Sequence, residues 1–270
     1  MIKKKQINKI TNLAKDMRKI ILEVSLTCGE PTHIGGALSI TDIMATLYGK
    51  ILNINLKDPK DRFVLSKGHG FLGLLSALYC KKFIKKNELL KFQTDGSELI
   101  AHPIVNDEIG IESSNGSLGQ GLSFGVGLAI AYKKKKKKHT VYVLIGDGEC
   151  YEGAIWEAAI SATESKLDNL IVIVDSNGYQ NDGAINEKMS TKMLKEKWKG
   201  FGWTTIECNG HKIDQLLKKL SYKSGGKPTA IIAKTVKGKG VKFMENNNDW
   251  HHGRLTQKLY DEAIMDLKKI

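Results

Sequence analysis

Runs of apolar and β-branched residues alternate with longer amphipathic segments along most of the chain. The runs have the length and composition of buried strands, and they lie at 63–65, 141–145, 170–174, 203–208 and 228–233. Segments with helical spacing of apolar residues lie at 6–29, 42–50, 71–82, 116–132, 152–166, 189–199, 213–220 and 255–267. This alternation predicts an α/β fold with three layers, in which helices cover both faces of a mainly parallel central sheet.

The connections and the length add a few expectations. Residues 31–36 contain Pro31, Gly35 and Gly36 and predict a loop, after which Ser39 or Thr41 would cap the next helix. With 270 residues and no internal repeat, residues 1–270 are expected to form a single domain.

The chain has no apolar run of about eighteen residues and no apolar stretch behind its charged start, so we expect neither a membrane span nor a signal peptide. Four widely spaced cysteines are typical of reduced thiols in a cytoplasmic protein.

The formal net charge of +13 raises the question of a nucleic acid partner. The excess is carried by lysines spread along the chain, and the run 133–138 is most simply a solvated connection. Basic and aromatic residues do not alternate as they do in a platform for stacked bases. We therefore expect no nucleic acid partner; the charge would instead favour acidic sugar phosphates or an acidic partner chain.

The residues with the clearest chemistry follow two of the predicted strands. Asp147 follows the strand 141–145, and Asn177 follows the strand 170–174. In open α/β sheets, ligands bind outside the carboxyl ends of the strands, where both residues would lie. A carboxylate and an amide carbonyl are oxygen ligands suited to Mg²⁺, for which Ca²⁺ can substitute. The glycines on either side of Asp147 would let the backbone approach a diphosphate closely.

The order Gly146-Asp147-Gly148, helix, strand and Asn177 resembles the thiamine diphosphate motif. The fuller pattern, GDGE followed by DSNGYQNDG, resembles that of transketolases. The resemblance implies that Asp147, Asn177 and the backbone carbonyl of Tyr179 bind the metal. It also places Gly148, Glu149 and Asn177 at the cofactor. Taken singly, Asp147 and Asn177 are also typical of an ordinary surface turn and an Asx turn.

Four histidines lie in segments that resemble transketolase motifs. His69 follows the strand 63–65 in the sequence Leu-Ser-Lys-Gly-His, and the resemblance implies that it binds the cofactor diphosphate. His33 and His102 would line the sugar channel, and His252 would contact both substrate and diphosphate. All four would serve as hydrogen-bond and proton-transfer groups. From the residues alone, His102 is nearly as well explained as a surface loop histidine.

Two further segments carry implied roles. Residues 116–121 resemble the transketolase segment Gly-x-Leu-Gly-Gln-Gly, in which Gly116, Ser117 and Leu118 would contact the aminopyrimidine ring of the cofactor. Glu152 and Glu157 would join a buried acidic network that links the two cofactors of a dimer. Two glutamates on a helix after a turn are more commonly solvated.

The resemblance covers residues from about 10 to 260 and implies transfer of a two-carbon ketol unit from a ketose phosphate to an aldose phosphate in the pentose phosphate pathway. The pyrimidine-binding and C-terminal domains of transketolases have no counterpart in the sequence. The chain is thus expected to be the N-terminal subunit of a split transketolase, working as a heterotetramer with a separately encoded C-terminal subunit. Two alternatives stay open. One is a subunit of another thiamine diphosphate enzyme, similar to 1-deoxyxylulose-5-phosphate synthase or a specialised sugar transketolase, and the other is a non-catalytic basic binding module.

Overall fold

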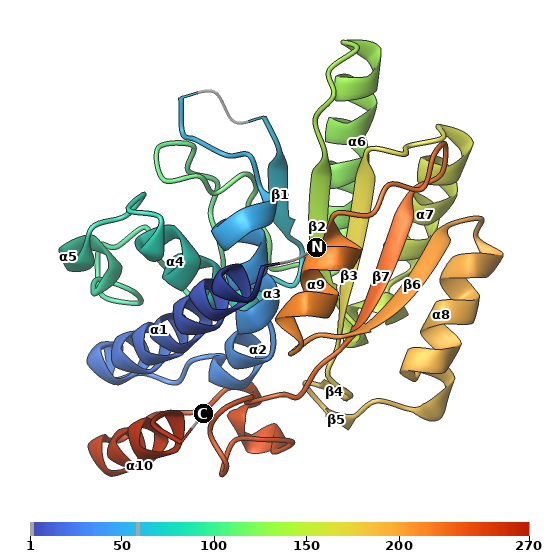
Figure 1. Ribbon diagram of the computed structural model, residues 1–270. Helices are drawn as coiled ribbons and strands as arrows, with labels where there is room; N and C mark the ends of the chain where they lie inside the picture. The colour runs from blue at the N-terminus through green and yellow to red at the C-terminus, as the bar shows by residue number, and fades with distance from the viewer. Residues whose placement is uncertain (1–2, 58–59, 270) are drawn as a thin grey trace.

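A parallel five-stranded sheet forms the centre of the protein (Figure 1). The computed structural model describes residues 3–57 and 60–269. The strands lie in the order β1-β2-β3-β7-β6, with bounds Arg62–Leu65 for β1, Val141–Gly146 for β2, Leu170–Ser176 for β3, Thr229–Lys234 for β7 and Thr204–Asn209 for β6. All four pairings are parallel. The predicted α/β fold with a parallel sheet is confirmed, and each predicted strand is present within one or two residues.

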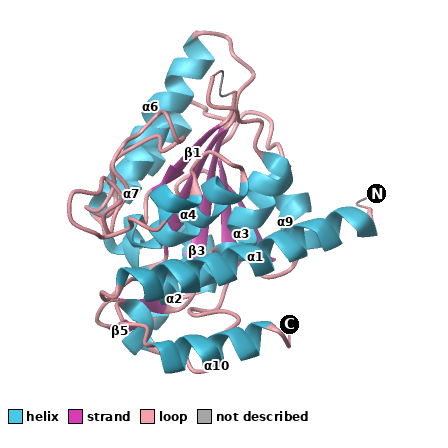
Figure 2. Ribbon diagram, turned by 90° about the vertical axis from the view of Figure 1, so that its left-hand side faces the viewer, coloured by secondary structure: helices cyan, strands magenta, loops and turns pink. Residues whose placement is uncertain are grey.

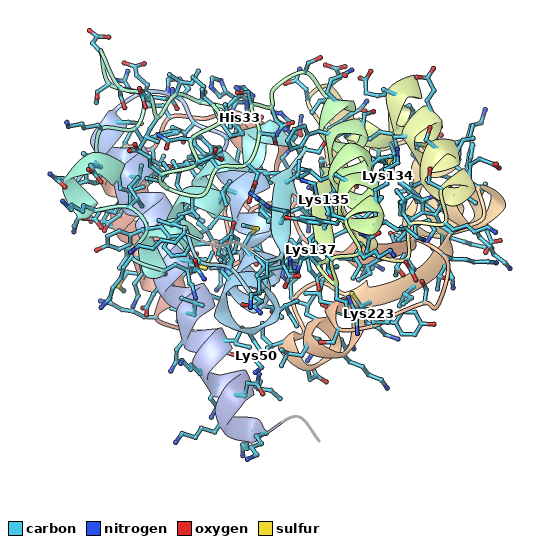
Figure 3. The ribbon with its side chains drawn as sticks, turned by 90° about the horizontal axis from the view of Figure 1, so that it is seen from above. His33, Lys50, Lys134, Lys135, Lys137 and Lys223 are labelled. Carbon is cyan, nitrogen blue, oxygen red and sulfur yellow. The ribbon has the colours of Figure 1, made fainter. Side chains whose placement is uncertain are left out.

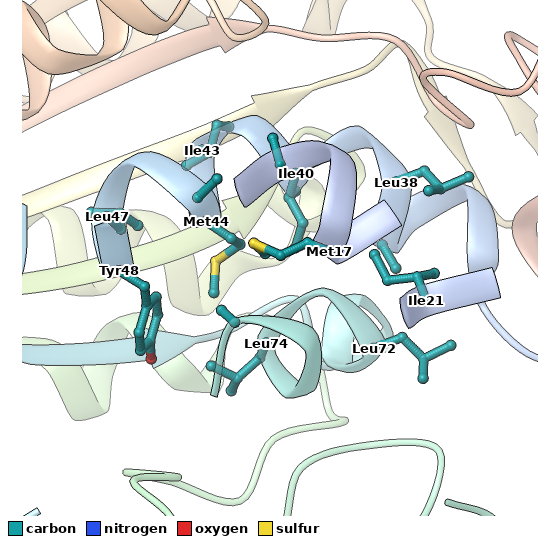
Figure 4. Packing of buried hydrophobic residues seen from close by; sticks show 14 of the residues in the cluster. Met17, Ile21, Leu38, Ile40, Ile43, Met44, Leu47, Tyr48, Leu72 and Leu74 are labelled. Carbon is teal, nitrogen blue, oxygen red and sulfur yellow. The ribbon is translucent and has the colours of Figure 1, made fainter. Parts of the chain in front are cut away.

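One face of the sheet is covered by α1 (Lys4–Cys28), α2 (Ile34–Ser39), α3 (Thr41–Thr46), α4 (Phe71–Cys80) and α9 (Ile213–Leu220). Met17 and Ile21 of α1 pack between residues of α3 and α4 such as Met44 and Leu74 (Figure 4). The last helix, α10 (Gln257–Leu267), lies against α1 (Figure 2). Tyr142, Leu144 and the other strand residues that point to this side are buried among these helices.

The opposite face is covered by α6 (Gln120–Lys134), α7 (Gly153–Glu164) and α8 (Thr191–Gly200). Val141, Val143 and Ile145 of β2 point to this side, because side chains alternate along a strand. Helix α6 approaches β2 so closely that a Cβ added at Gly125 would lie 2.4 Å from a methyl carbon of Val143. The small residues of this helix therefore permit close packing on the sheet.

The structure corrects the expectations for residues 31–50. The predicted loop at 31–36 ends early, because α2 begins at Ile34; Gly35 lies against the backbone of Trp250, where a Cβ would be 2.6 Å from the carbonyl oxygen. The predicted helix at 42–50 is divided into α3 and a π-helical turn, Leu47–Ile51. Neither expected cap forms, since Ser39 Oγ donates to Asp175 and Thr41 Oγ1 donates to Ala37 O. Tertiary contacts override the local preference of these residues.

Short elements complete the chain. They are α5 (Lys86–Leu89), the hairpin strands β4 (Tyr179–Gln180) and β5 (Gly183–Ala184), and 3₁₀ turns at Gly68–Gly70, Gly148–Tyr151, Glu187–Met189 and Asn248–His251. The predicted helix 116–132 begins only at Gln120, after Gly119 in a left-handed conformation (φ 86°). None of the helices within residues 3–57 and 60–269 is long and apolar enough to cross a membrane.

Candidate active site

Polar side chains gather where four neighbouring strands end. His69 follows β1, Asp147 follows β2, Asn177 follows β3, and Lys237 lies three residues beyond β7. A cavity of about 230 Å³ lies at this edge of the sheet. Its lining includes Lys67, His69, Leu118, Asp147, Gly148, Glu149, Glu152, Asn177, Tyr179 and His251. The structure thus brings together, from distant parts of the sequence, most of the residues expected to hold the cofactor.

Asp147 is a buried carboxylate held by two backbone amides. Gly148 N donates to Oδ1 at 2.9 Å and Gly178 N donates to Oδ2 at 2.7 Å. Burial, together with the neighbouring charge of Asp175, raises the pKa of Asp147 to about 7. The two amides fix its orientation but do not compensate its charge, so a cation at this position would stabilise the carboxylate.

Asn177 is oriented by both ends of its amide. Its Nδ2 donates to Asp175 Oδ2 at 2.9 Å, and its Oδ1 accepts from Tyr179 N at 3.0 Å. Among residues 3–57 and 60–269, no three or more histidine, cysteine or acidic residues are arranged to hold a metal ion. A carboxylate with amide and carbonyl oxygens suits Mg²⁺ or Ca²⁺ instead. The donor set at Asp147 and Asn177 therefore fits a hard cation.

Asp175 and Lys67 form a buried ion pair beneath the cavity. Their side chains are 0% and 1% exposed, and Lys67 Nζ lies 2.5 Å from Asp175 Oδ2. Asp175 also accepts hydrogen bonds from Ser39 at 2.7 Å and from Thr235. Although burial acts to raise its pKa, Lys67 and these hydroxyl donors hold the pKa of Asp175 below its usual range. The pair ties the end of β3 to the turn after β1.

Four imidazoles crowd around His33. Their ring centroids lie 4.6 Å from it for His252, 5.3 Å for His102, 5.6 Å for His251 and 5.9 Å for His69. Burial lowers the pKa of His33 to about 3 and that of His251 to about 4, with neighbouring cationic groups acting in the same direction. Burial is also the main cause that lowers the pKa of His69 and His102. The four histidines predicted from the sequence do converge, and His251 joins them.

Lys237 is the functional candidate that the sequence reasoning missed. It is 2% exposed, and its Nζ lies 2.8 Å from His251 Nδ1 and 3.1 Å from Asn248 Oδ1. Burial, then the nearby charge of Lys67, lowers its pKa to about 8. In the described part of the chain, no carboxylate lies within ion-pair distance of it. The signal was its place among the lysines and glycines of 234–240, which follow a buried strand, since a phosphate there would neutralise its charge.

The remaining predicted residues take different places. Glu149 is buried and accepts from Ser66 Oγ at 2.5 Å, Gly119 N at 2.9 Å and Gly146 N at 3.0 Å, so it braces three segments around the cavity. Glu152 and Glu157 are exposed on this single chain. Gly116 and Ser117 border a neighbouring cavity of about 300 Å³ together with His102. Leu118 lines the cavity that contains Asp147.

This geometry agrees with the comparison to protein families. Residues 2–269 match the family described as transketolase, thiamine diphosphate binding domain. The chain belongs to the transketolase family. The family predicted from the motifs is confirmed, and thiamine diphosphate binding is a property of the matched domain.

Two groups of transketolases are similar to the chain over different shares of their length. A subunit of the apulose-4-phosphate transketolase of Phocaeicola vulgatus is 38% identical, covering 98% of this chain and 95% of its own. A 6-deoxy-6-sulfo-D-fructose transketolase subunit of a Clostridium species is 37% identical, covering 95% of both. Human transketolase is 35% identical over 88% of this chain but only 38% of its own length.

Solved transketolases have the same fold. The structure from Campylobacter jejuni has a TM-score of 0.86 and 28% identity, covering 99% of this chain and 43% of its own. The structure from Leishmania mexicana has a TM-score of 0.81 and 27% identity, covering 96% and 44%. The chain thus spans less than half the length of these solved transketolases and nearly the full length of the two transketolase subunits.

Proposed function

We propose that this chain is the cofactor-binding subunit of a two-chain transketolase that transfers a two-carbon ketol unit between sugars. The observation that carries the proposal is the convergence of Asp147, Asn177 and Lys237 with a histidine cluster at one edge of the sheet. The end-to-end similarity to relatives that are named as subunits supports a separately encoded C-terminal partner in a heterotetramer. Such an assembly would work in the cytoplasm.

The residues around the cavity divide the work of holding the cofactor. Asp147, the Asn177 side chain and the Tyr179 carbonyl would hold Mg²⁺, and Gly148, His69 and His252 would contact the diphosphate. Lys237 would add a cation for the phosphates, because it is buried and none of the carboxylates in the described residues pairs with it. Glu149 would act by positioning the turns at Gly119 and Gly146. Thiamine diphosphate, when bound, supplies the electron sink that a carbon–carbon cleavage needs.

The open side of the site would receive the partner and the sugar. His33 and His102 would orient the substrate hydroxyls and exchange protons with them. Gly116, Ser117 and Leu118 would supply backbone contacts to the aminopyrimidine ring. Glu152 and Glu157 would become buried only when a second subunit covers α7, because both are exposed on the single chain. All of these residues would belong to one domain, which we propose comprises residues 1–270.

A specialised sugar transketolase is the second candidate. The similar subunits are named for apulose 4-phosphate and for 6-deoxy-6-sulfo-D-fructose, rather than for sugars of the pentose phosphate pathway. A panel of ketose donors that includes both compounds and xylulose 5-phosphate would separate the two candidates. Preference for xylulose 5-phosphate would favour a transketolase of the pentose phosphate pathway over a specialised sugar transketolase.

Calorimetric titration with thiamine diphosphate and Mg²⁺ tests the proposal, on this chain alone and mixed with its partner subunit. We expect Asp147→Ala to abolish Mg²⁺-dependent binding, whereas Asp214→Ala, on the exposed face of α9, should bind as the wild type does. Ketol transfer should require the mixture. The absence of cofactor binding in both samples would refute the proposal, and full activity of the pure chain would refute the need for a partner.

A further inference from the structure

A second, larger cavity lies at the opposite edge of the sheet. Its volume is about 980 Å³, and it borders the residues where β1 and β2 begin, such as Asp61 and Thr140. The cavity with Asp147 lies where the same strands end, so the two are separated by the length of β2, roughly 20 Å for its six residues. Nothing in the proposed ketol transfer uses this cavity. Its volume is within the range of small-molecule sites.

The lining of this cavity has an excess of positive charge. Among residues 3–57 and 60–269, five lysines contribute to it, Lys50, Lys60, Lys138, Lys218 and Lys223, against one carboxylate, that of Asp61. With His139 neutral, the formal charge of the lining is thus +4. In Figure 3, Lys50 and Lys223 lie on the same side of the molecule, well apart from His33 of the histidine cluster.

These lysines have few partners within the chain. Asp61 is occupied, since its two oxygens accept from Asn53 N and Thr140 N, each at 2.9 Å. Lys223 Nζ donates to Thr140 Oγ1 at 2.6 Å, and over the described residues none of the five lysines pairs with a carboxylate. Several ammonium groups that surround a hollow repel each other, and an anion in the hollow would relieve that repulsion.

Two features narrow the class of anion. Ile51, Leu217 and Tyr142 give the lining an apolar part, and the Tyr142 hydroxyl is already used in a hydrogen bond to Leu220 O at 3.2 Å. An adjoining cavity of about 390 Å³ shares Lys138 and Lys223 and adds Lys136, Lys137 and the ion pair of Lys133 with Asp168 at 3.5 Å. Lysine ammoniums bind phosphates as point charges, and the apolar part offers space for a ring.

We propose that this cavity binds a small molecule with several phosphate groups, of the nucleoside polyphosphate class, at a site separate from the thiamine diphosphate site. The lysines line a hollow that also has an apolar part, which is typical of a small-molecule site. The inference does not depend on the proposed ketol transfer, because it rests on different residues.

Titration calorimetry of the full chain with ATP and with inorganic tripolyphosphate, at low and high salt, tests this site. We expect one molecule to bind per chain, with affinity that falls as salt rises. The triple variant Lys50→Gln, Lys218→Gln and Lys223→Gln should weaken binding by roughly tenfold or more, since three charge contacts are lost. The matched variant Lys188→Gln, Lys192→Gln and Lys199→Gln removes three exposed lysines elsewhere and should bind as the wild type does.

The outcomes show which part of the ligand is recognised and whether another site or ligand explains the binding. Equal affinity for ATP and tripolyphosphate would assign the binding to the phosphates alone, and tighter binding of ATP would show that the apolar part takes up the base. The proposal is overturned by the absence of binding, by equal losses in the two triple variants, or by competition with excess thiamine diphosphate. Tighter binding of a short single-stranded oligonucleotide that depends on Lys50, Lys218 and Lys223 would overturn it in favour of nucleic acid.

Discussion

Replacement of Lys67 by methionine should destabilise the protein although the two side chains have similar volumes. The variant leaves the Asp175 carboxylate buried without its cation, at 0% exposure. Breaking a buried ion pair by removing one partner costs about 3–5 kcal/mol. Asp175 keeps three other donors, from Ser39, Asn177 and Thr235, so we expect a loss near the lower end, about 3 kcal/mol.

A double-mutant cycle measures whether the loss comes from the pair itself. Lys67→Met, Asp175→Asn and the double variant would be unfolded in urea and followed by circular dichroism. The double variant removes both charges, so its loss should be smaller than the sum of the single losses by about 2 kcal/mol. Lys19→Met serves as the control, because its ion pair with Asp16 is more than half exposed and should contribute under about 0.5 kcal/mol.

The pH dependence gives an independent check. Because the pKa of Asp175 is lowered by folding, the stability that it contributes is present above the pKa of an unfolded aspartate and is lost as the pH falls through the folded value. Lys67→Met should therefore lose less stability than the wild type on acidification. Two results together would refute the stabilising role of the ion pair. One is that the losses of the single variants add up to that of the double variant within about 0.5 kcal/mol, and the other is that Lys67→Met loses as much stability on acidification as the wild type does.

Three other substitutions test the fold in the same urea assay. Burial acts to raise the pKa of Asp42, but Arg18 beside it holds that pKa at about 2, so the stability that Asp42→Asn removes should shrink by about 2 kcal/mol as the pH falls from 5 to 2. Gly125→Ala places a Cβ 2.4 Å from a Val143 methyl carbon and should cost about 1–3 kcal/mol by overpacking. Met17→Ala removes a fully buried side chain and should cost about 2–5 kcal/mol.

Each of these has a matched control in the chain. Asp214→Asn changes an exposed aspartate and should change the stability by less than about 0.5 kcal/mol. Gly127→Ala, two positions from Gly125 with open space around it, should be neutral or stabilising. Met193→Ala removes a side chain that is 41% exposed and should cost little. Equal effects in a variant and its control would contradict the packing or charge assigned to that position.

The strands were predictable from the sequence because most of them are buried on both faces. Runs such as 141–145 and 170–174 are apolar throughout, as expected for strands of a sheet that helices cover on both faces. The order in the sheet was not predictable in this way. β7 lies between β3 and β6, and nothing in the local pattern of 204–209 or 229–234 decides which of the two pairs with β3.

The site residues that lie in turns directly after buried strands were predictable from the sequence. Those whose role depends on burial and on distant partners were not. Asp147 and Asn177 follow buried strands, so their meeting at one edge follows from the parallel fold. Lys67 gave no such signal, because lysine is ordinarily solvated, and Lys237 gave only a weak one through the lysines and glycines of 234–240. Lys67 becomes informative only through Asp175, which lies 108 positions away in the sequence. Contacts between residues far apart in the sequence also explain why α2 was not predicted: Gly35 fits against Trp250 and Lys237.

The charges of the site divide between two kinds of residue. Crowding and burial place the pKa of His33 and His251 well below neutrality, so near pH 7 these imidazoles are uncharged and can both donate and accept hydrogen bonds. Fixed positive charge near the cavity must then come from Lys67 and Lys237. Lys67 is neutralised by Asp175, which leaves Lys237 as the cation available to an anionic ligand. We therefore propose that phosphate recognition and proton exchange would fall to different side chains at this edge of the sheet.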